Sequence, residues 1–507
     1  VNWSSMIKKL GLFIFLSLAL SSVAQQGFIT HVQDSLLPVY FNNLLIQNDT
    51  ILVLGRTFKG DNFINGIRIS AFDTLGNALF TREYFDEQGD DYILEDNYSL
   101  IKCRNGYAIT GNLWDRNWGI LLKLDDQFNK VFVTEYPDST IVNTRQRRVI
   151  ELPDGYLLAG TKQRHTFDTD IYAMKVDTLG NLVWERFFGT TNTNETIRRV
   201  IQIDDEEHWL IGNKGGGHNS SDLTKSWSDI YLINIDGLGQ VKKEFWIKTD
   251  DLDGIISDTD IYIEQQDTVI MFGCALGDIN QYGDSFISQH RLMGISTNGE
   301  IIYETPIGDW NSLSYLNYDR SCRVVDDGFL LAGQMEEFPE EGRLRPPTIF
   351  KFDLNGDSLW HFRNDMDWSL GDHLAYETTG MEVMPSGSIV ACGYVRYLGT
   401  NIQKGFLLKI DKNGCLIPGC RETSSVKTDE VGDIDIFPNP ARDVVNVKVS
   451  QPATITLNDL QGRIVLDQPL TIGQNSINIP DTAKFSVLLY RIEGDGWLKS
   501  GKLVIYD

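Results

Sequence analysis

The 507-residue chain is predicted to be all-β: a seven-bladed β-propeller followed by a small C-terminal β-sandwich. Three observations predict this fold. A glycine recurs after an apolar run at intervals of roughly 50–60 residues, and an Asp-x-x-Gly turn recurs between strand-like segments. In addition, no amphipathic stretch of about 12 or more residues with helical periodicity appears between 25 and 420.

The first segment, residues 1–24, is predicted to be a secretory signal peptide. Met6–Lys9 is positively charged, Leu10–Leu20 is apolar, and Ser22–Ala24 has the small-x-small pattern of a cleavage site. Translation is expected to start at Met6. The apolar span is too short for a permanent anchor, and no later stretch is long and apolar enough to be a transmembrane helix.

Residues 25–420 form the expected propeller, because one sequence unit repeats along them. Half of the unit is a turn and an apolar run that ends in glycine, as in Asp154-Gly-Tyr-Leu-Leu-Ala-Gly160. We expect each of these glycines to close a strand. They are Gly55, Gly111, Gly160, Gly212, Gly273, Gly333 and Gly393.

The other half of the unit is the Asp-x-x-Gly turn, as in Asp177-Thr-Leu-Gly180. The aspartate is expected to accept hydrogen bonds from the backbone ahead of it, and the glycine to supply a positive φ. Two copies are degraded: Asp125–Phe128 lacks the glycine, and Ser296–Gly299 lacks the aspartate.

These repeats resemble those of Bacteroidetes surface proteins with a seven-bladed β-propeller, and the Asp-x-x-Gly-x-x-x-Trp step is similar to quinoprotein-type blades. The resemblance implies a fold and no activity. We expect Trp184 and Trp360 to pack between blades rather than on a cofactor. Phe28–Gln33 is a candidate outer strand for the last blade, which would close the ring and remove its exposed edges.

After a polar linker at 421–433, residues 434–507 show short strands separated by turns, which predicts the sandwich. The segments Phe437-Pro-Asn-Pro440, Asp459-Leu-Gln-Gly-Arg463 and Lys502-Leu-Val-Ile505 resemble, in order, motifs of the type A C-terminal sorting domain of the Bacteroidetes type IX secretion system. One departure is that the strand at 485–492 lacks the usual leading glycine. The matching motif residues are Pro438, Asn439, Pro440, Asp459, Gly462, Arg463 and Lys502.

This resemblance implies handling by the type IX secretion machinery, removal of the sorting domain, and either attachment to the outer cell surface or release. An ordinary terminal sandwich that serves adhesion is the alternative. We expect the protein to act outside the cell, as a monomer.

Composition excludes some partners. The net charge of −25 and the pI near 4.7 argue against binding to nucleic acid or to anionic membranes, since a basic face is missing. Six cysteines would face an oxidising compartment, and Cys415 and Cys420 are close enough to form a short disulfide loop across Gly and Pro. The other cysteines lie in apolar strand patterns.

No catalytic motif appears: H-E-x-x-H, G-x-S-x-G and a phosphate-binding loop are all absent from the sequence. No cofactor is identified. Ca²⁺ is a weak candidate at an acidic segment that is otherwise expected to be a solvated loop, and Asp86–Asp91 has the same two interpretations. The candidate Ca²⁺ ligands are Asp251, Asp253, Asp258 and Asp260.

One further polar cluster, His361 and His373 with the aspartates between them, is a weak candidate for metal binding or catalysis. The four tryptophans that fall in expected loops are either ligand-binding aromatics or inter-blade packing. They are Trp114, Trp118, Trp227 and Trp310.

The leading functional hypothesis is an exported propeller that binds an extracellular glycan or protein through loops at one end of the ring. The alternative is a glycan-degrading hydrolase or lyase that uses acidic residues in the funnel, and these cannot be picked out of 70 acidic residues by sequence. A mainly structural surface component is a third reading. A quinone-dependent dehydrogenase is weaker, because no adjacent cysteine pair accompanies the blade step.

Overall fold

The chain divides into two compact units, Val1–Pro418 and Gly419–Asp507. A computed structural model describes the residues 27–32, 38–59, 64–94, 99–138, 140–165, 168–191, 193–216, 228–247, 253–264, 267–279, 286–307, 321–334, 346–363, 374–397, 403–416, 420, 435–439, 441–458, 464–480, 487–494 and 497–505, with backbone alone for 253–291. Every regular element among them is a β-strand, which confirms the all-β class.

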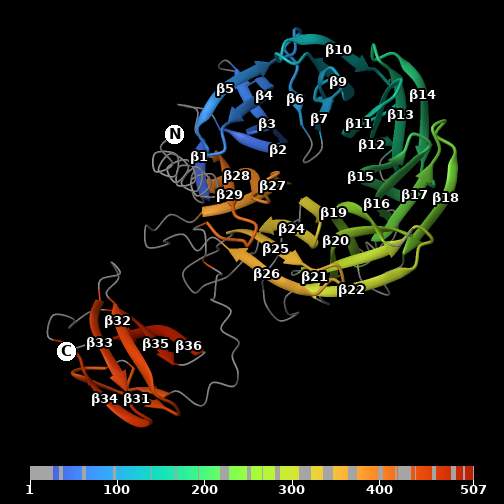
Figure 1. The fold of residues 1–507 in the computed structure, drawn as a ribbon. Helices are drawn as coiled ribbons and strands as arrows, with labels where there is room; N and C mark the ends of the chain where they lie inside the picture. Colours follow the sequence, from blue (N-terminus) through green and yellow to red (C-terminus); the bar gives the residue numbers. More distant parts are fainter. Residues whose placement is uncertain are drawn as a thin grey trace, which may run out of the picture. The chain divides into compact units, whose positions relative to one another are not determined.

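The strands of the first unit form antiparallel meanders arranged in a ring around a central opening (Figure 1). We number the meanders I to VII. They are I, β2 (Tyr40–Gln47), β3 (Thr50–Lys59), β4 (Ile64–Phe72) and β5 (Ala78–Tyr84); II, β6 (Tyr92–Ile93), β7 (Leu100–Cys103), β8 (Gly106–Leu113), β9 (Trp118–Leu124) and β10 (Lys130–Tyr136); III, β11 (Asn143–Leu152), β12 (Gly155–His165), β13 (Asp168–Asp177) and β14 (Leu182–Phe188).

The chain continues around the ring in the same way. These meanders are IV, β15 (Thr193–Asp204), β16 (Glu207–Gly216), β17 (Ser228–Ile235) and β18 (Val241–Ile247); V, β19 (Asp253–Glu264), β20 (Asp267–Ile279), β21 (Phe286–Ser296) and β22 (Ile301–Ile307); VI, β23 (Ser321–Val325), β24 (Gly328–Gln334), β25 (Pro347–Phe352) and β26 (Ser358–Arg363); VII, β27 (Leu374–Val383), β28 (Ile389–Tyr397), β29 (Gln403–Ile410) and β1 (Phe28–Val32).

This arrangement is a β-propeller, as the repeat predicts. The first strand of each meander lies at the inner edge and the last at the outer edge (Figure 1). Meanders III and IV share one sheet through a parallel bridge between Thr169 and Asn194. Because the count of seven refers to the described residues alone, the total number of blades stays a prediction from the sequence.

The ring is closed by a strand from the start of the chain. β1 pairs antiparallel with β29, with Phe28 opposite Lys409 and Val32 opposite Gly405, so meander VII takes its outer strand from residues some 380 positions earlier. The sequence prediction of this closing strand is confirmed for Phe28–Val32. Because of this pairing, β29 has a partner strand on both sides, and β1 becomes the outer edge strand of meander VII.

The recurring glycines do not close strands, and that prediction is wrong. Gly160 lies in the middle of β12, opposite a β-bulge in the inner strand β11, where the pairing shifts between Gln146 and Arg148. A Cβ on Gly160 would lie 2.3 Å from the carbonyl oxygen of Arg145. Gly55, Gly212 and Gly393 face bulged inner strands in the same way, so glycine marks the point where the inner strand bends toward its neighbour.

The Asp-x-x-Gly turns form as predicted. Asp177 Oδ1 accepts from the backbone N–H of Leu179 and Asn181 at 2.9 and 2.8 Å, and Gly180 has a φ of +86°. In the degraded copy with serine, Ser296 Oγ accepts the equivalent bonds at 3.3 and 3.2 Å. In the copy without glycine, Phe128 itself adopts a φ of +64°.

Each turn also receives an aromatic ring from the outer strand of the preceding meander. A Cβ on Gly239 would lie 2.8 Å from the ring of Trp184, and one on Gly414 would lie 2.7 Å from that of Trp360. The same contact joins every pair of neighbouring meanders among the described residues. The pairs are Phe28 with Gly76, Phe80 with Phe128, Phe132 with Gly180, Trp184 with Gly239, Phe245 with Gly299, Tyr303 with Gly356, and Trp360 with Gly414.

The prediction that Trp184 and Trp360 pack between blades is therefore confirmed. The Trp184 indole N–H also donates to the carbonyl of Gly237 at 3.3 Å. At the turn without glycine, the ring of Phe128 contacts Phe80 of meander I, with centroids 5.1 Å apart, and stacks on Tyr107 of its own meander, with centroids 4.5 Å apart. Buried aliphatic side chains such as Leu54 in meander I and Ile109 in meander II fill the space between facing sheets.

The second unit is a small sandwich of two sheets around one core (Figure 1). Val445 and Val447 of the first sheet share that core with Ile455 and Ile492 of the second. The sheets are β30 (Asp435–Phe437), β31 (Val444–Val449) and β34 (Gly473–Asn478), and β33 (Ile464–Leu470), β32 (Ala453–Asn458), β35 (Val487–Gly494) and β36 (Trp497–Val504).

Replacement of Trp184 by Ala should destabilise the propeller by about 2 kcal/mol, because the half-buried ring fills the space over Gly239; this is less than the roughly 3–5 kcal/mol of a fully buried aromatic. Urea unfolding of the full chain measures the change. Trp114→Ala is the matched control, since that side chain is 60% exposed, and it should cost less than about 0.5 kcal/mol. Equal effects of the two substitutions would contradict the inter-blade role.

The turn hydrogen bonds predict a pH dependence. Hydrogen bonds from the side chain and backbone of Asn181 lower the pKa of Asp177 in the folded protein. The ionised Asp177 therefore stabilises the fold at pH values above its unfolded-state pKa, and this stabilisation is lost as the pH falls through the folded-state pKa. Asp177→Ala should therefore lower the melting temperature at pH 6 and have little effect near pH 2. Glu300→Ala, which removes an exposed side chain beside another turn, is the control. A deficit in D177A that is the same at both pH values would contradict the prediction.

Candidate functional site

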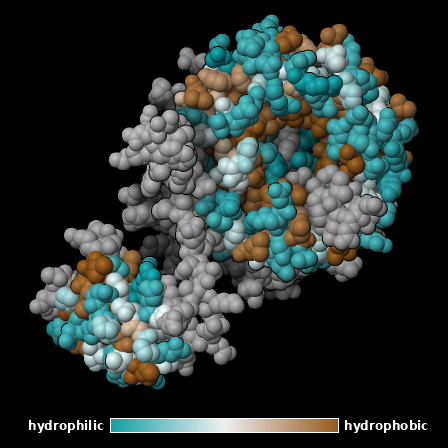
Figure 2. All heavy atoms as spheres, viewed as in Figure 1, coloured by the Kyte–Doolittle hydropathy of each residue, from teal (hydrophilic) through white to brown (hydrophobic). Residues whose placement is uncertain are grey.

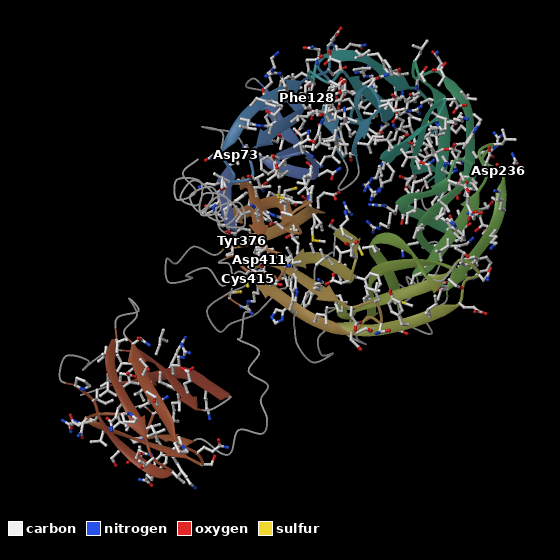
Figure 3. All side chains as sticks on the ribbon, viewed as in Figure 1. Asp73, Phe128, Asp236, Tyr376, Asp411 and Cys415 are labelled. Carbon is white, nitrogen blue, oxygen red and sulfur yellow. The ribbon has the colours of Figure 1, made fainter. Side chains whose placement is uncertain are left out.

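The inner strands β11 and β15 carry five arginines near the central opening. The two strands lie side by side in the ring (Figure 1). A hydrogen bond of 2.5 Å from Arg148 Nε to the carbonyl of Arg198 joins them. Arg148 also donates from Nη1 to the carbonyl of Arg147 at 3.1 Å. Figure 3 shows nitrogen-tipped side chains reaching into the opening on this side of the ring. We call this the arginine cluster: Arg145, Arg147, Arg148, Arg198 and Arg199.

Two buried carboxyl groups lie beside the cluster, at the start of β15 and of β13. Glu195 Oε1 accepts from Thr193 Oγ1 at 2.5 Å and lies 3.4 Å from Lys214 Nζ, while Asp170 Oδ2 lies 3.1 Å from Arg164 Nε. Oxygens of both carboxyls lie within 3.0 Å of the point that a Cβ on Gly189 would occupy. Burial raises the pKa of Glu195 and of Asp170.

In the acidic segment Asp86–Asp91, which is a loop, Glu87 and Gln88 are exposed, whereas the side chains of Asp86 and Asp90 are largely buried against Arg116. The guanidinium of Arg116 binds Asp86 at 2.7 Å, Asp90 at 2.9 Å and Glu135 at 2.8 Å. Asp90 also accepts the backbone N–H of Asp91 and Asp115, and the net effect of its hydrogen bonds is to lower its pKa despite burial. Arg116 therefore joins the connection between β5 and β6 to the outer strand β10 through three ion pairs.

The other Ca²⁺ candidates lie in a strand where a loop was expected. Asp253, Asp258 and Asp260 all fall within β19, and the bulge between Ile256 and Asp258 makes this inner strand resemble its neighbours. Asp251 lies outside the described residues. Among the described side chains, no group of three or more His, Cys, Asp or Glu is placed to hold a metal ion. Ca²⁺ binding by the side chains of β19 stays a prediction.

The remaining sequence candidates are not brought together. His361 lies exposed in β26, against Phe350, whereas His373 and the aspartates before it fall outside the described part of the chain. Trp114 is exposed, Trp118 packs under the Arg116 guanidinium at 5.4 Å, and Trp227 and Trp310 are not described. The choice between ligand binding and inter-blade packing for these tryptophans stays a prediction.

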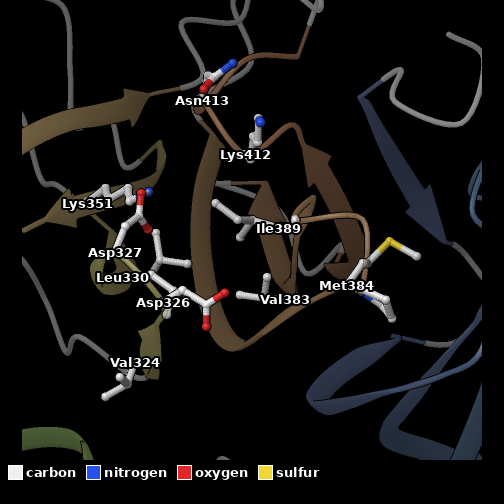
Figure 4. Close-up of a pocket in the computed structure, with 13 residues that line it drawn as sticks. Val324, Asp326, Asp327, Leu330, Lys351, Val383, Met384, Ile389, Lys412 and Asn413 are labelled. Atoms are coloured by element: carbon white, nitrogen blue, oxygen red, sulfur yellow. Dashed lines mark hydrogen bonds and ion pairs between the residues drawn. The ribbon is translucent and has the colours of Figure 1, made fainter. Parts of the chain in front are cut away.

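A cavity of about 610 Å³ lies between meanders VI and VII, where the inner strands β23 and β27 end in their hairpin turns (Figure 4). Aliphatic side chains such as Val383 and Ile389 form part of its wall. Lys351 donates to Asp327 at 2.7 Å and lowers the pKa of that carboxyl. The arginine cluster lies on β11 and β15 of meanders III and IV, so this cavity is a separate feature of the ring.

Cysteine placement follows the prediction. Cys415 and Cys420 are disulfide-bonded, next to the turn of Asp411. Cys103, Cys322 and Cys392 are buried free thiols, and burial raises the pKa of Cys103 to about 11.

The second unit contains the predicted sorting motifs, of which three residues are described. Asn439 donates from its side-chain amide to the carbonyl of Lys502 at 2.8 Å and accepts the N–H of Val504 at 2.9 Å, which joins the opening segment beside Pro438 to the last strand. The others, Pro440, Asp459, Gly462 and Arg463, lie outside the described residues.

Residues 435–505 match the family described as secretion system C-terminal sorting domain. The chain ends in a type IX sorting domain. The protein is therefore exported, to the cell surface or the medium, and is handled by the type IX secretion machinery. Among the described residues, none forms a helix with the length and apolarity to cross a membrane.

Comparison finds no matching curated protein. Solved structures with similar folds include the β-propeller domain of the Trilobed protease from Pyrococcus furiosus, at 9% identity and a TM-score of 0.40, covering 76% of this chain and 98% of that one. The α-L-arabinofuranosidase Arb93A from Fusarium graminearum matches at 11% identity and a TM-score of 0.40, over 61% and 92%. An exo-β-1,3-galactanase from Phanerochaete chrysosporium matches at 9% and 0.32, over 83% and 97%.

Sequence reasoning missed the arginine cluster, although a signal was present. Arg145-Gln-Arg-Arg148 and Arg198-Arg199 each precede an apolar run that ends at a recurring glycine, so both fall on inner strands of neighbouring repeats. The net charge of −25 of the whole chain conceals this local excess of arginine.

The substitution Glu195→Gln should abolish the decrease in stability that the wild-type protein shows as the pH rises. Because burial raises the folded-state pKa of Glu195 above the unfolded value of about 4.3, the native protein loses stability as the pH rises from there through the folded-state pKa. The wild type and E195Q should have similar melting temperatures near pH 4, and the variant should melt at the higher temperature at pH 7. Glu300→Gln, at an exposed position, is the control. A constant offset between E195Q and the wild type would contradict the assignment.

Proposed function

We propose that this exported propeller binds an extracellular glycan or protein at the end of the ring where the inner strands begin. The observation that carries the proposal is the row of bulged inner strands, which bring polar side chains to the same level of the ring. Asn42, Arg147, Arg198 and Thr379 occupy these bulges in four meanders, and of them Arg147 and Arg198 are partly exposed whereas Asn42 and Thr379 are buried. Bulges redirect side chains and are frequent beside functional sites.

A closed ring suits binding, because its inner strands are held in place before a ligand arrives. Between meanders VII and I, Thr379 Oγ1 donates to the carbonyl of Phe41 at 2.8 Å. Between meanders II and III, Gln146 donates from its backbone N–H to Asn112 Oδ1 at 2.7 Å and from its side chain to the carbonyl of Ile120, also at 2.7 Å. A preorganised surface loses little conformational entropy on binding.

The buried carboxyl pair does not favour a glycan-degrading enzyme over a binder. An acid–base pair needs two carboxyls whose pKa values are pushed apart, whereas burial raises both pKa values here. The side chain of Glu195 has no exposed surface and Asp170 has little, so neither is open to a substrate. Their hydrogen bonds to Thr193 and Arg164 suit a structural role.

The proposal predicts binding without turnover. The purified full chain, applied to glycan and protein arrays with and without Ca²⁺, should retain at least one class of ligand, and bound glycans should release no new reducing ends. Absence of binding on every array would contradict the proposal. Cleavage of an arrayed glycan would favour the enzyme, and binding that needs Ca²⁺ would point to the aspartates of β19.

A further inference from the structure

The arginine cluster is a strongly basic region in an acidic protein. Residues 143–150 and 196–203 contain five arginines and no lysine, aspartate or glutamate, whereas the whole chain has a net charge of −25. Both segments belong to inner strands. These two inner strands therefore carry a local excess of positive charge, next to the inner strand β19 with Asp253, Asp258 and Asp260.

Geometry explains why these arginines gather. Arg147 and Arg198 are the extra residues of the bulges in β11 and β15, so each strand presents two consecutive arginines where its backbone bends. The bulged residues of β2 and β27, Asn42 and Thr379, are uncharged. Arginine at the bulge is thus found in the neighbouring meanders III and IV and is not shared by the bulges of β2 and β27.

Arg148 is the buried member, with 5% of its surface exposed, and its guanidinium donates to the carbonyls of Arg147 and Arg198. It holds the two bulges together and acts as a positioning residue. Arg145 is exposed, and Arg147, Arg198 and Arg199 are partly exposed. Arg145 is thus the most exposed member, and the other three keep part of their surface exposed although Nε of Arg147 and Arg198 and Nη1 of Arg199 are buried.

We propose that the arginine cluster binds a polysaccharide that carries carboxylate or sulfate groups. This rests on the proposed function and names its ligand class. The planar guanidinium forms two parallel hydrogen bonds to an oxyanion, which makes arginine well suited to such groups. Neighbouring arginines on β11 and β15 raise the local positive potential, while the acidic remainder of the protein repels polyanions.

The test compares polymers that share one backbone: dextran, carboxymethyl-dextran and dextran sulfate. The full chain should bind one or both charged forms and not dextran, and binding should weaken as NaCl is raised from 50 to 500 mM. The two charged polymers distinguish carboxylate from sulfate recognition. Equal binding to all three polymers, or to none, would overturn the proposal.

Variants locate the site. The double variant Arg147→Gln/Arg198→Gln should bind the charged polymer at least about tenfold more weakly, and the exposed Arg145→Glu should also weaken it. Arg186→Gln is the matched control: this arginine is exposed on the outer strand β14 of the same meander. If the melting temperature shows that the double variant is unfolded, the affinity of the Arg145→Glu variant alone tests the proposal. Unchanged affinity in a folded variant would overturn the proposal.

The proposed function and the assignment of an anionic ligand can be contradicted independently of each other. Retention of neutral glycans or proteins on the arrays, with no binding to either charged dextran, would leave the proposed function standing and overturn the assignment of an anionic ligand. Binding to nothing on the arrays and to none of the three polymers would overturn both.

Discussion

The ring depends on one repeated contact, the packing of an outer-strand aromatic onto the turn of the next meander. The aspartate fixes the turn through backbone N–H groups, and the residue three positions later takes a positive φ; where that residue is glycine, no side chain lies in the way of the ring. Trp184 over Gly239 shows the usual form. Phe80 with Phe128 shows that the contact survives loss of the glycine, because an aromatic residue at the turn supplies its own stacking surface.

The same contact explains how the ends of the propeller meet. β1 completes meander VII by pairing with β29, and its Phe28 packs on Gly76 of meander I as the other aromatics pack on their own neighbours. Lys409 of β29 also donates to the carbonyl of Thr74, in the turn that contains Gly76. The last interface thus uses the same interactions as the rest, although its aromatic comes from the opposite end of the chain.

Much of this fold could be predicted because it depends on local chemistry. The turn of Asp177, the closing strand at Phe28 and the disulfide of Cys415 follow from residue type and spacing. The bulge opposite Gly160 could not, since a glycine in an apolar run is equally consistent with a strand end, and only the nearby carbonyl of Arg145 distinguishes the two. The network of Arg116 was missed for a similar reason: its three acidic partners are spread over 50 residues.

The net charge of the whole chain does not reveal the local charge of the arginine cluster. A net charge of −25 describes the chain as a whole, but the arginines of β11 and β15 lie together on two neighbouring inner strands, where like charges add to the local potential. An acidic exterior does not oppose an anionic ligand at such a site. It removes competing positions on the same molecule, so that selectivity arises from repulsion elsewhere as much as from attraction at the centre.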